Sequence, residues 1–246
     1  ITCRIRGGYF INPRWGKEVR KGRYSGEVVS EYTSDELAKM SEGEINSIIS
    51  RDLYVNAYED QIKDPIPYFC KNPAEHLETA LYACPECKTF SCLESSGDLL
   101  KCKSCCMKLR FSRFGYFERE SAPPVFRTIL DWDKWQEKYL RSYLGEKINP
   151  SVPLFSDDNV CLSAVIPGKG SEMLTSGTLS LYFDRLEIKG ASAGHIFPIK
   201  DISRFSATLT STMLFTANDN YYEIKPKGIC NARKYISAWR YIKNMR

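Results

Sequence analysis

The pattern of hydrophobic and polar positions predicts two strands and then helices in the first 80 residues. Residues 1–11 alternate loosely and lead to Gly7-Gly8, so we expect a buried strand of a larger sheet. Residues 23–32 favour a second strand. Ser41-Glu42-Gly43-Glu44 is a capping box, in which the serine hydroxyl and the glutamate carboxylate satisfy free backbone N–H groups. Ile45, Ile48, Ile49 and Leu53 follow at helical spacing, which predicts a helix with one buried face.

Two further helices are predicted before residue 150. Asn72-Pro73-Ala74-Glu75 has the composition of a helix start and predicts a helix over 73–82. It contains His76, which we interpret as a surface or packing residue because no nucleophile pattern surrounds it. Residues 128–144 form an amphipathic pattern whose aromatic stripe is more typical of a core than of a ligand site; the stripe consists of Ile129, Trp132, Trp135, Tyr139 and Tyr143.

After residue 157 the pattern changes to short strands and tight turns. Seven strands are expected, over 160–166, 178–183, 185–189, 195–198, 203–209, 212–216 and 221–225. A final helix is capped by Asn231 and places Tyr235, Ile236, Trp239 and Ile242 on one face, with Arg233, Lys234, Arg240 and Lys243 towards the other. This order predicts a small β-barrel or sandwich closed by the helix, and a pleckstrin-homology-like barrel fits it.

Composition limits the class of protein. The 246 residues are 43% hydrophobic, which supports real cores. No run approaches the ~20 apolar residues of a membrane span, and no signal peptide is visible. The chain starts with Ile1 inside a predicted strand, so we expect a piece of a longer protein. Ten cysteines, scattered apart from one cluster, fit a reducing cytosol better than an oxidised, secreted protein.

The clustered cysteines have the spacing of a metal site. Cys84-Pro-Glu-Cys87 and Cys102-Lys-Ser-Cys105 are two Cys-x-x-Cys pairs separated by residues 88–101. A turn signal at 95–98 divides this separation into a hairpin, and 108–112 alternates like a third strand. We therefore predict a zinc ribbon with a closed, structural Zn²⁺ site. Cys106 competes with Cys105 for the fourth position, and the pair spacing favours Cys105.

Positive charge is unevenly distributed. The formal charge is +5, but residues 4–23 contain seven basic residues and one acid, and residues 101–119 contain six basic residues and one acid. Such clusters suit phosphate groups on nucleic acids or lipids, and a solvated surface is an equally good interpretation of either one alone.

Several short motifs, taken in order, resemble the later part of bacterial, clostridial-type lysophosphatidic acid acyltransferases, which carry a zinc ribbon after the acyltransferase fold. Only the ribbon is specific by itself. The matching segments are Gly7-Gly8-Tyr9, Pro13-Arg14-Trp15, Arg20-Lys21-Gly22, Leu53-Tyr54-Val55, Ala74-Glu75-His76-Leu77-Glu78, the four cysteines, 155–163, 182–185 and 231–235.

The resemblance implies an α+β protein in four parts: 1–82 as the end of an α/β acyltransferase domain, 83–120 as the zinc ribbon, 121–150 as a helix and linker, and 151–246 as the barrel. It implies acyl transfer from acyl carrier protein or acyl-CoA to lysophosphatidic acid, at the inner face of the cell membrane. The family's catalytic His-x-x-x-x-Asp motif is absent, because Leu81 follows His76 and Lys200 follows His195 at that spacing. We expect that motif, and the family's Phe-Pro-Glu-Gly-type phosphate motif, upstream of Ile1.

The resemblance assigns no catalytic residue within this chain. It places the strand before the first basic cluster at the edge of the acyltransferase sheet. We therefore hypothesise that Arg14, Lys17, Arg20 and Lys21 face anionic phospholipid or the phosphate of lysophosphatidic acid. Two alternatives stay open: a nucleic-acid-binding zinc ribbon, disfavoured by the low overall charge, and a protein-interaction module.

Overall fold

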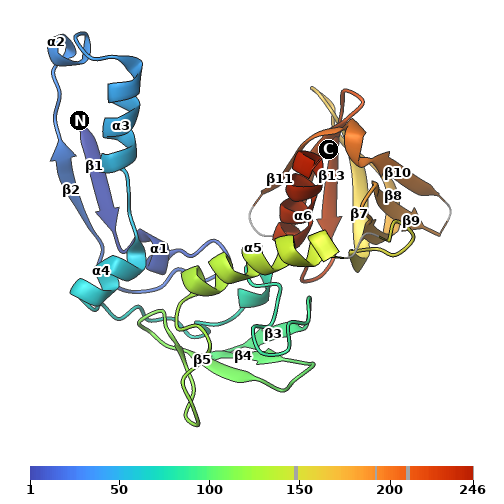
Figure 1. Cartoon of the computed structure of the whole chain (residues 1–246), viewed down its shortest axis with the longest axis horizontal. Coiled ribbons are helices and arrows are strands. Elements are labelled where there is room, and N and C mark those ends of the chain that lie inside the picture. The colour runs from blue at the N-terminus through green and yellow to red at the C-terminus, as the bar shows by residue number, and fades with distance from the viewer. Residues whose placement is uncertain (147–148, 192, 209–210, 246) are drawn as a thin grey trace.

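Three antiparallel sheets and six α-helices make up the part of the chain that the computed structural model describes, residues 1–146, 149–191, 193–208 and 211–245. The protein is therefore of the mixed α+β class, with sheet predominating. Helix α5 (Ile129–Glu146) runs between the N-terminal half and the C-terminal sheet (Figure 1). None of the described helices has the length and hydrophobicity that crossing a bilayer requires.

The N-terminal segment forms an arm that projects from the rest of the molecule (Figure 1). It consists of the hairpin β1 (Thr2–Arg6) and β2 (Ser25–Ser30) and the helices α2 (Ser34–Leu37) and α3 (Glu42–Asp52). The predicted capping box of α3 is present, with the Glu44 N–H donating to Ser41 Oγ at 3.3 Å and the Ser41 N–H donating to Glu44 at 2.8 Å.

Two predictions for this arm are wrong in the described structure. The strand predicted over 1–11 is limited to β1, pairs only with β2 and is largely exposed; residues 8–11 form the short helix α1 (Gly8–Ile11). Helix α3 does not bury its apolar face either, since Ile49 is 42% and Leu53 54% exposed. Both predictions needed a packing partner that the described residues do not provide.

The middle of the chain is a four-stranded sheet that forms the ribbon. Its order is β3-β4-β5-β6, with the predicted hairpin turn at Gly97-Asp98 between the first two strands. Helix α4 (Ala57–Lys63) precedes it. The strands are β3 (Leu93–Ser96), β4 (Leu99–Cys102), β5 (Lys108–Phe111) and β6 (Phe117–Glu118).

The helix predicted over 73–82 is not an α-helix. Only Leu77–Thr79 is helical, and it is a 3-10 turn. His76 has a left-handed φ of 72°, which an α-helix does not allow, and its N–H donates to Ser95 Oγ at 2.7 Å. Ala74, Leu77 and Leu81 are all fully buried, so packing against the ribbon replaces the regular helix.

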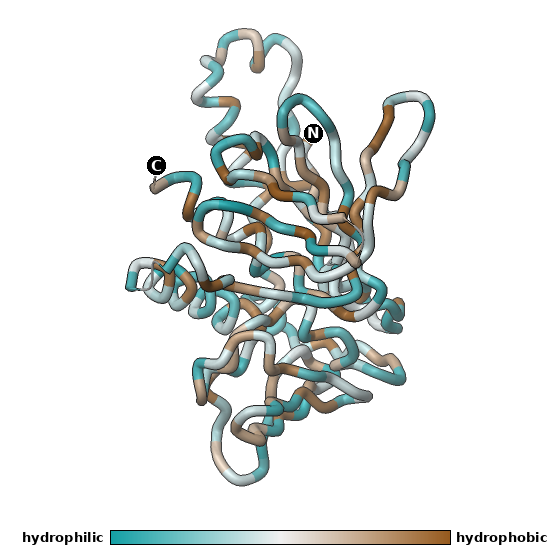
Figure 2. The backbone as a smooth tube through the Cα atoms, turned by 90° about the vertical axis from the view of Figure 1, so that its right-hand side faces the viewer, coloured by the Kyte–Doolittle hydropathy of each residue, from teal (hydrophilic) through white to brown (hydrophobic). Residues whose placement is uncertain are grey.

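The C-terminal region is a seven-stranded sheet covered by helix α6 (Ala232–Met245). All seven predicted strands are present, and the sheet order is β10-β9-β8-β7-β13-β12-β11. Hydropathy alternates along them (Figure 2), and β12 alternates strictly between half-buried and buried residues. The strands are β7 (Phe155–Ile166), β8 (Gly170–Leu181), β9 (Arg185–Gly190), β10 (Gly194–Pro198), β11 (Ile202–Thr208), β12 (Thr212–Ala217) and β13 (Asn220–Pro226).

The sheet differs from the prediction at its edges. Among the described strands β10 and β11 do not pair, so the sheet is open and not a closed barrel. A second 3-10 turn, Ile199–Asp201, connects these two edge strands. Leu209, the predicted last residue of the fifth strand, lies outside the described residues.

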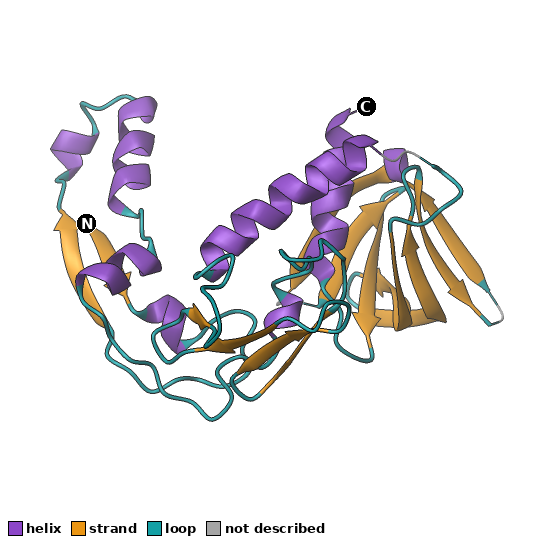
Figure 3. Ribbon diagram, turned by 60° about the horizontal axis from the view of Figure 1, so that its bottom comes forward, coloured by secondary structure: helices purple, strands orange, loops and turns teal. Residues whose placement is uncertain are grey.

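Two hydrophobic cores share helix α5. Ile129 and Trp132 at its N-terminal end belong to the ribbon core, which also includes Phe10, Trp15, Tyr58 and Tyr68. Leu140 and Leu144 at its C-terminal end belong to the sheet core under α6. The predicted aromatic stripe is therefore mainly packing, and Trp135 and Tyr139 stack with ring centroids 5.2 Å apart. Figure 3 shows α5 reaching from the ribbon side to the sheet, with the arm at the opposite end of the molecule.

Candidate metal centre

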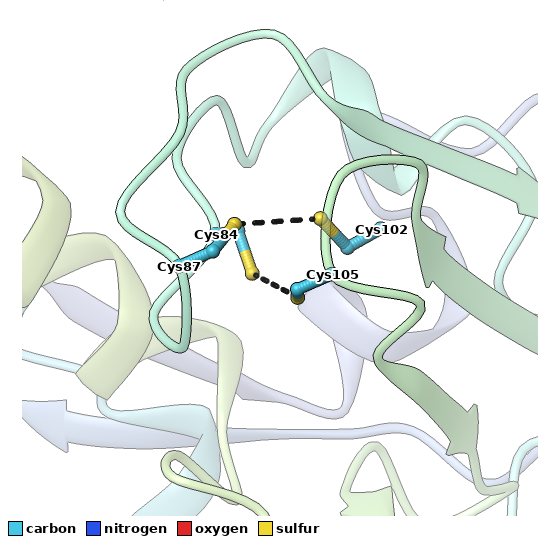
Figure 4. Close-up of side chains that lie close together, drawn as sticks. All are labelled: Cys84, Cys87, Cys102 and Cys105. Atoms are coloured by element: carbon cyan, nitrogen blue, oxygen red, sulfur yellow. Dashed lines mark hydrogen bonds between the residues drawn. The ribbon is translucent and has the colours of Figure 1, made fainter.

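Two matching turns present the four predicted cysteines. The first follows Ala83, whose backbone pairs with Phe90, and the second connects β4 to β5. In each turn the N–H after the second cysteine donates to the carbonyl of the first: Lys88 to Cys84 at 2.9 Å and Cys106 to Cys102 at 3.0 Å. Lys88 and Cys106 both adopt left-handed backbone, with φ of 59° and 61°. The two Cys-x-x-Cys segments are thus equivalent turns that face each other (Figure 4).

The four sulfur atoms lie at distances that suit one tetrahedral cation. Cys84 Sγ is 3.7 Å from Cys105 Sγ, and Cys87 Sγ is 3.7 Å from Cys102 Sγ. All four lie within 4.8 Å of one another. A tetrahedron with Zn–S bonds of about 2.3 Å has sulfur–sulfur edges of about 3.8 Å. Cys84, Cys87, Cys102 and Cys105 could therefore hold a metal ion.

The cluster contains Cys105 and not Cys106. Cys106 occupies the left-handed position, and its side chain is exposed. The ligand set favoured by the pair spacing is the set that the fold brings together.

The thiols differ in acidity. Hydrogen bonding to Cys92 and burial raise the pKa of Cys84 far above its ordinary value, and burial raises the pKa of Cys102 to about 11. Burial also acts to raise the pKa of Cys87, but hydrogen bonds from Thr89 and from neighbouring thiols lower it to about 6. Since a metal ligand must be a thiolate, a bound divalent cation would supply the charge that stabilises the buried members.

A fifth cysteine adjoins the cluster and was missed from the sequence. Cys92 is buried, its Sγ lies 3.4 Å from Cys102 Sγ, and its thiol donates to the Thr89 carbonyl at 3.1 Å. Cys92 belongs to neither Cys-x-x-Cys pair, so its position in the sequence does not indicate a place near the metal site. Its position beside a ligand sulfur suits an outer hydrogen-bonding role.

The metal centre is fixed from outside by α5. The Trp132 indole N–H donates to the Ala83 carbonyl at 2.9 Å, directly before Cys84. The Gln136 side chain accepts from the Tyr82 N–H at 2.9 Å and donates to the Ala80 carbonyl at 3.0 Å. The Trp132 and Gln136 side chains are fully buried, so these hydrogen bonds hold the segment that enters the first turn in one position.

The four basic residues hypothesised to face lipid do not share one environment. Arg14, Lys17 and Lys21 are exposed. Arg20 is only 3% exposed: its guanidinium donates to the Pro73 carbonyl at 2.8 Å and lies 4.8 Å above the Trp15 ring. Burial lowers the pKa of Arg20. Arg20 is therefore a packing residue of the ribbon core and is not part of the exposed basic surface.

No protein-family model matches the sequence. No curated protein matches it either. Among solved structures, a chain of "The 8S snRNP Assembly Intermediate" is similar over 41% of this chain and 88% of its own length, with 14% sequence identity and a TM-score of 0.31. A similarity at that TM-score carries no argument about fold or function.

Proposed function

We propose that this chain is the zinc-stabilised C-terminal region of a phospholipid-synthesis acyltransferase, which transfers an acyl group from a thioester to lysophosphatidic acid. The ordered motifs from Gly7-Gly8-Tyr9 to 231–235 support the family, and the ribbon is the only specific one among them. The observation that carries the proposal is the four-sulfur geometry at the ribbon, because the resemblance implies a four-cysteine metal site at this place in the chain.

The metal in this proposal is Zn²⁺ with a structural role. Four thiolates in a tetrahedral arrangement are the donor set that zinc prefers, and they leave no position for a reactive water. The chemistry of acyl transfer then belongs to residues outside these 246. The donor, acyl carrier protein or acyl-CoA, would bind there as well.

The C-terminal sheet supports a pleckstrin-homology-like fold in this proposal. Seven antiparallel strands precede one amphipathic helix, and the first strand, β7, lies beside the last, β13. Membrane attachment in the proposal uses the exposed Arg14, Lys17 and Lys21. Anionic lipid headgroups attract such basic side chains by roughly 1 kcal/mol each.

The acyltransferase proposal is tested on the natural full-length protein. Purified protein is incubated with lysophosphatidic acid and either acyl-CoA or acyl carrier protein thioester, and phosphatidic acid is measured. We expect product with one of the donors, and none from the 246 residues alone. Absence of product with both donors, for a protein that is folded and zinc-loaded, would overturn the proposal. Salt-dependent binding of DNA or RNA instead would favour the nucleic-acid alternative.

A further inference from the structure

A cleft of about 1020 Å³ opens between the N-terminal segment and helices α5 and α6. Most of its lining comes from four parts of the chain: the segment around α1, residues 54–58, helix α5 and helix α6. Ligand pockets in proteins have volumes of about 300–1,000 Å³, so this cleft is large enough for a small organic molecule.

One wall of the cleft is aromatic and apolar. Tyr9 and Tyr58 line it with ring centroids 6.2 Å apart, next to the buried Trp15. Ile129 from α5 and Ile236 from α6 continue this wall. Such a surface accepts the uncharged part of a ligand.

The charged part of the lining is mainly positive. Four cations and two acids line the cleft: Arg14, Lys134, Arg233 and Arg240, with Asp133 and Glu137. Arg233 pairs with both acids, at 2.8 Å to Asp133 and 3.4 Å to Glu137. Arg14, Lys134 and Arg240 are exposed and have no ion-pair partner within the described residues. The cleft therefore carries a net charge of +2, and three of its cations are available to a ligand.

We propose that this cleft binds a phosphorylated small molecule, with Arg14, Lys134 and Arg240 at the phosphate and the aromatic wall against the organic part. Arginine and lysine are the side chains that bind phosphate, by charge-assisted hydrogen bonds that are stronger in a partly enclosed site. An anion without an organic part would leave the aromatic wall unused. The inference does not require acyl transfer, and it shares only Arg14 with the basic surface proposed above for membrane attachment.

The phosphate could belong to a soluble ester or to a lipid headgroup, and the experiment separates these. Calorimetric titration of the 246-residue chain uses inorganic phosphate and glycerol 3-phosphate, and flotation uses phosphatidylcholine vesicles with and without phosphatidic acid. The cleft variant combines Arg14→Gln, Lys134→Gln and Arg240→Gln. The matched control combines Lys138→Gln, Arg141→Gln and Lys169→Gln, which remove the same charge from exposed positions outside the cleft.

We expect the cleft variant to lose at least roughly tenfold in affinity for the phosphorylated probe, since it lacks the charge-assisted hydrogen bonds of three cations. The control should stay within about twofold. If the cleft variant loses binding of glycerol 3-phosphate, the ligand of the cleft is a soluble phosphate ester. If it loses only binding to vesicles that contain phosphatidic acid, the ligand is a lipid headgroup. Equal losses in both variants, or no binding of any probe by the unchanged chain, would overturn the inference. Equal thermal midpoints establish that both variants are folded.

Discussion

At the scale of single residues, backbone conformation selects the metal ligands. Positions after the second cysteine of each pair are left-handed, a conformation that costs a non-glycine residue roughly 1–2 kcal/mol. Lys88 and Cys106 accept this cost because their N–H groups close the two turns. The Cys105 sulfur belongs to the four-sulfur cluster and the exposed Cys106 sulfur does not, so two adjacent cysteines have different roles.

Replacing each of these adjacent cysteines in turn tests the ligand assignment directly. Cys105→Ala should abolish stoichiometric metal binding, whereas Cys106→Ala should retain one ion per chain, as measured by elemental analysis of the purified protein. Cys106→Gly should also raise the free energy of unfolding by roughly 1 kcal/mol, because glycine adopts positive φ without strain. Metal retained by Cys105→Ala and lost by Cys106→Ala would contradict the assignment.

A second residue-scale feature is the buried Lys234. It was predicted on the polar face of α6, but it is 1% exposed and its ammonium donates to Asp157 at 2.6 Å and to Ser91 Oγ at 2.8 Å. Asp157 also accepts from the Tyr235 hydroxyl at 2.5 Å. Lys234 therefore connects α6 with β7 and with the loop that follows the first cysteine pair.

Replacing Lys234 by methionine should destabilise the protein by roughly 3 kcal/mol, since it leaves the Asp157 carboxylate partly buried without its cation. Chemical denaturation measures the change. The exposed Lys227→Met is the matched control and should change stability by less than about 0.5 kcal/mol. A cost for Lys234→Met as small as that of the control would show that the buried pair is not stabilising.

At the scale of elements, α5 is the helix that connects the two cores. Its N-terminal half packs on the ribbon and its C-terminal half on the sheet. Gln136 lies between the halves, is fully buried and satisfies the backbone of the segment leading into the metal centre. The helix thus holds the first pair of ligands as well as the sheet.

Gln136→Leu should cost about 2–4 kcal/mol of stability, because the buried Tyr82 N–H and the partly buried Ala80 carbonyl would each lose a partner. The variant should also bind zinc more weakly, which competition with a chromophoric chelator measures. Lys138→Leu, an exposed change of similar size on the same helix, should do neither. Unchanged zinc affinity in Gln136→Leu would show that the contacts of α5 do not contribute to metal binding.

At the scale of the whole molecule, the two cores differ in their dependence on the metal. The ribbon core contains three of the ligands, Cys84, Cys87 and Cys102, whereas the sheet core contains none. Several groups connect the two. Tyr82 and Ala83, directly before the first ligand, belong to the sheet core, and Phe90 packs against it. Lys234 donates to Ser91, and the Asn231 side chain donates to the Glu78 carbonyl at 2.9 Å.

Removing the metal with a strong chelator should therefore unfold the ribbon and leave most of the sheet folded. Hydrogen exchange should rise across residues 84–118 and stay low in the central strands β7 and β13. Unfolding of the entire chain in one step would mean that the ribbon and the sheet are a single cooperative unit. Unchanged exchange in residues 84–118 would mean that the metal does not support the ribbon.

The sequence by itself determined the features that depend on neighbours close in the chain. The cysteine spacing, the Ser41 capping box, the turn at Gly97-Asp98 and the period-two strands of the C-terminal sheet all encode short-range geometry, and all are present. These signals gave the four-cysteine ligand set and the strands of the C-terminal sheet.

Only the tertiary structure decided which residues are buried and how the parts connect. The sequence pattern predicts Arg20 and Lys234 as surface cations, but both are buried. Their hydrogen-bond partners, Pro73 and Ser91, lie 53 and 143 residues away. The helical pattern predicts that the α3 face at Ile49 is buried, but no element of the described structure covers it. The phosphate cleft likewise combines Arg14, Lys134 and Arg240, which no local pattern relates. Burial and charge clustering depend on contacts between distant segments, and a local pattern holds no information on which segments meet.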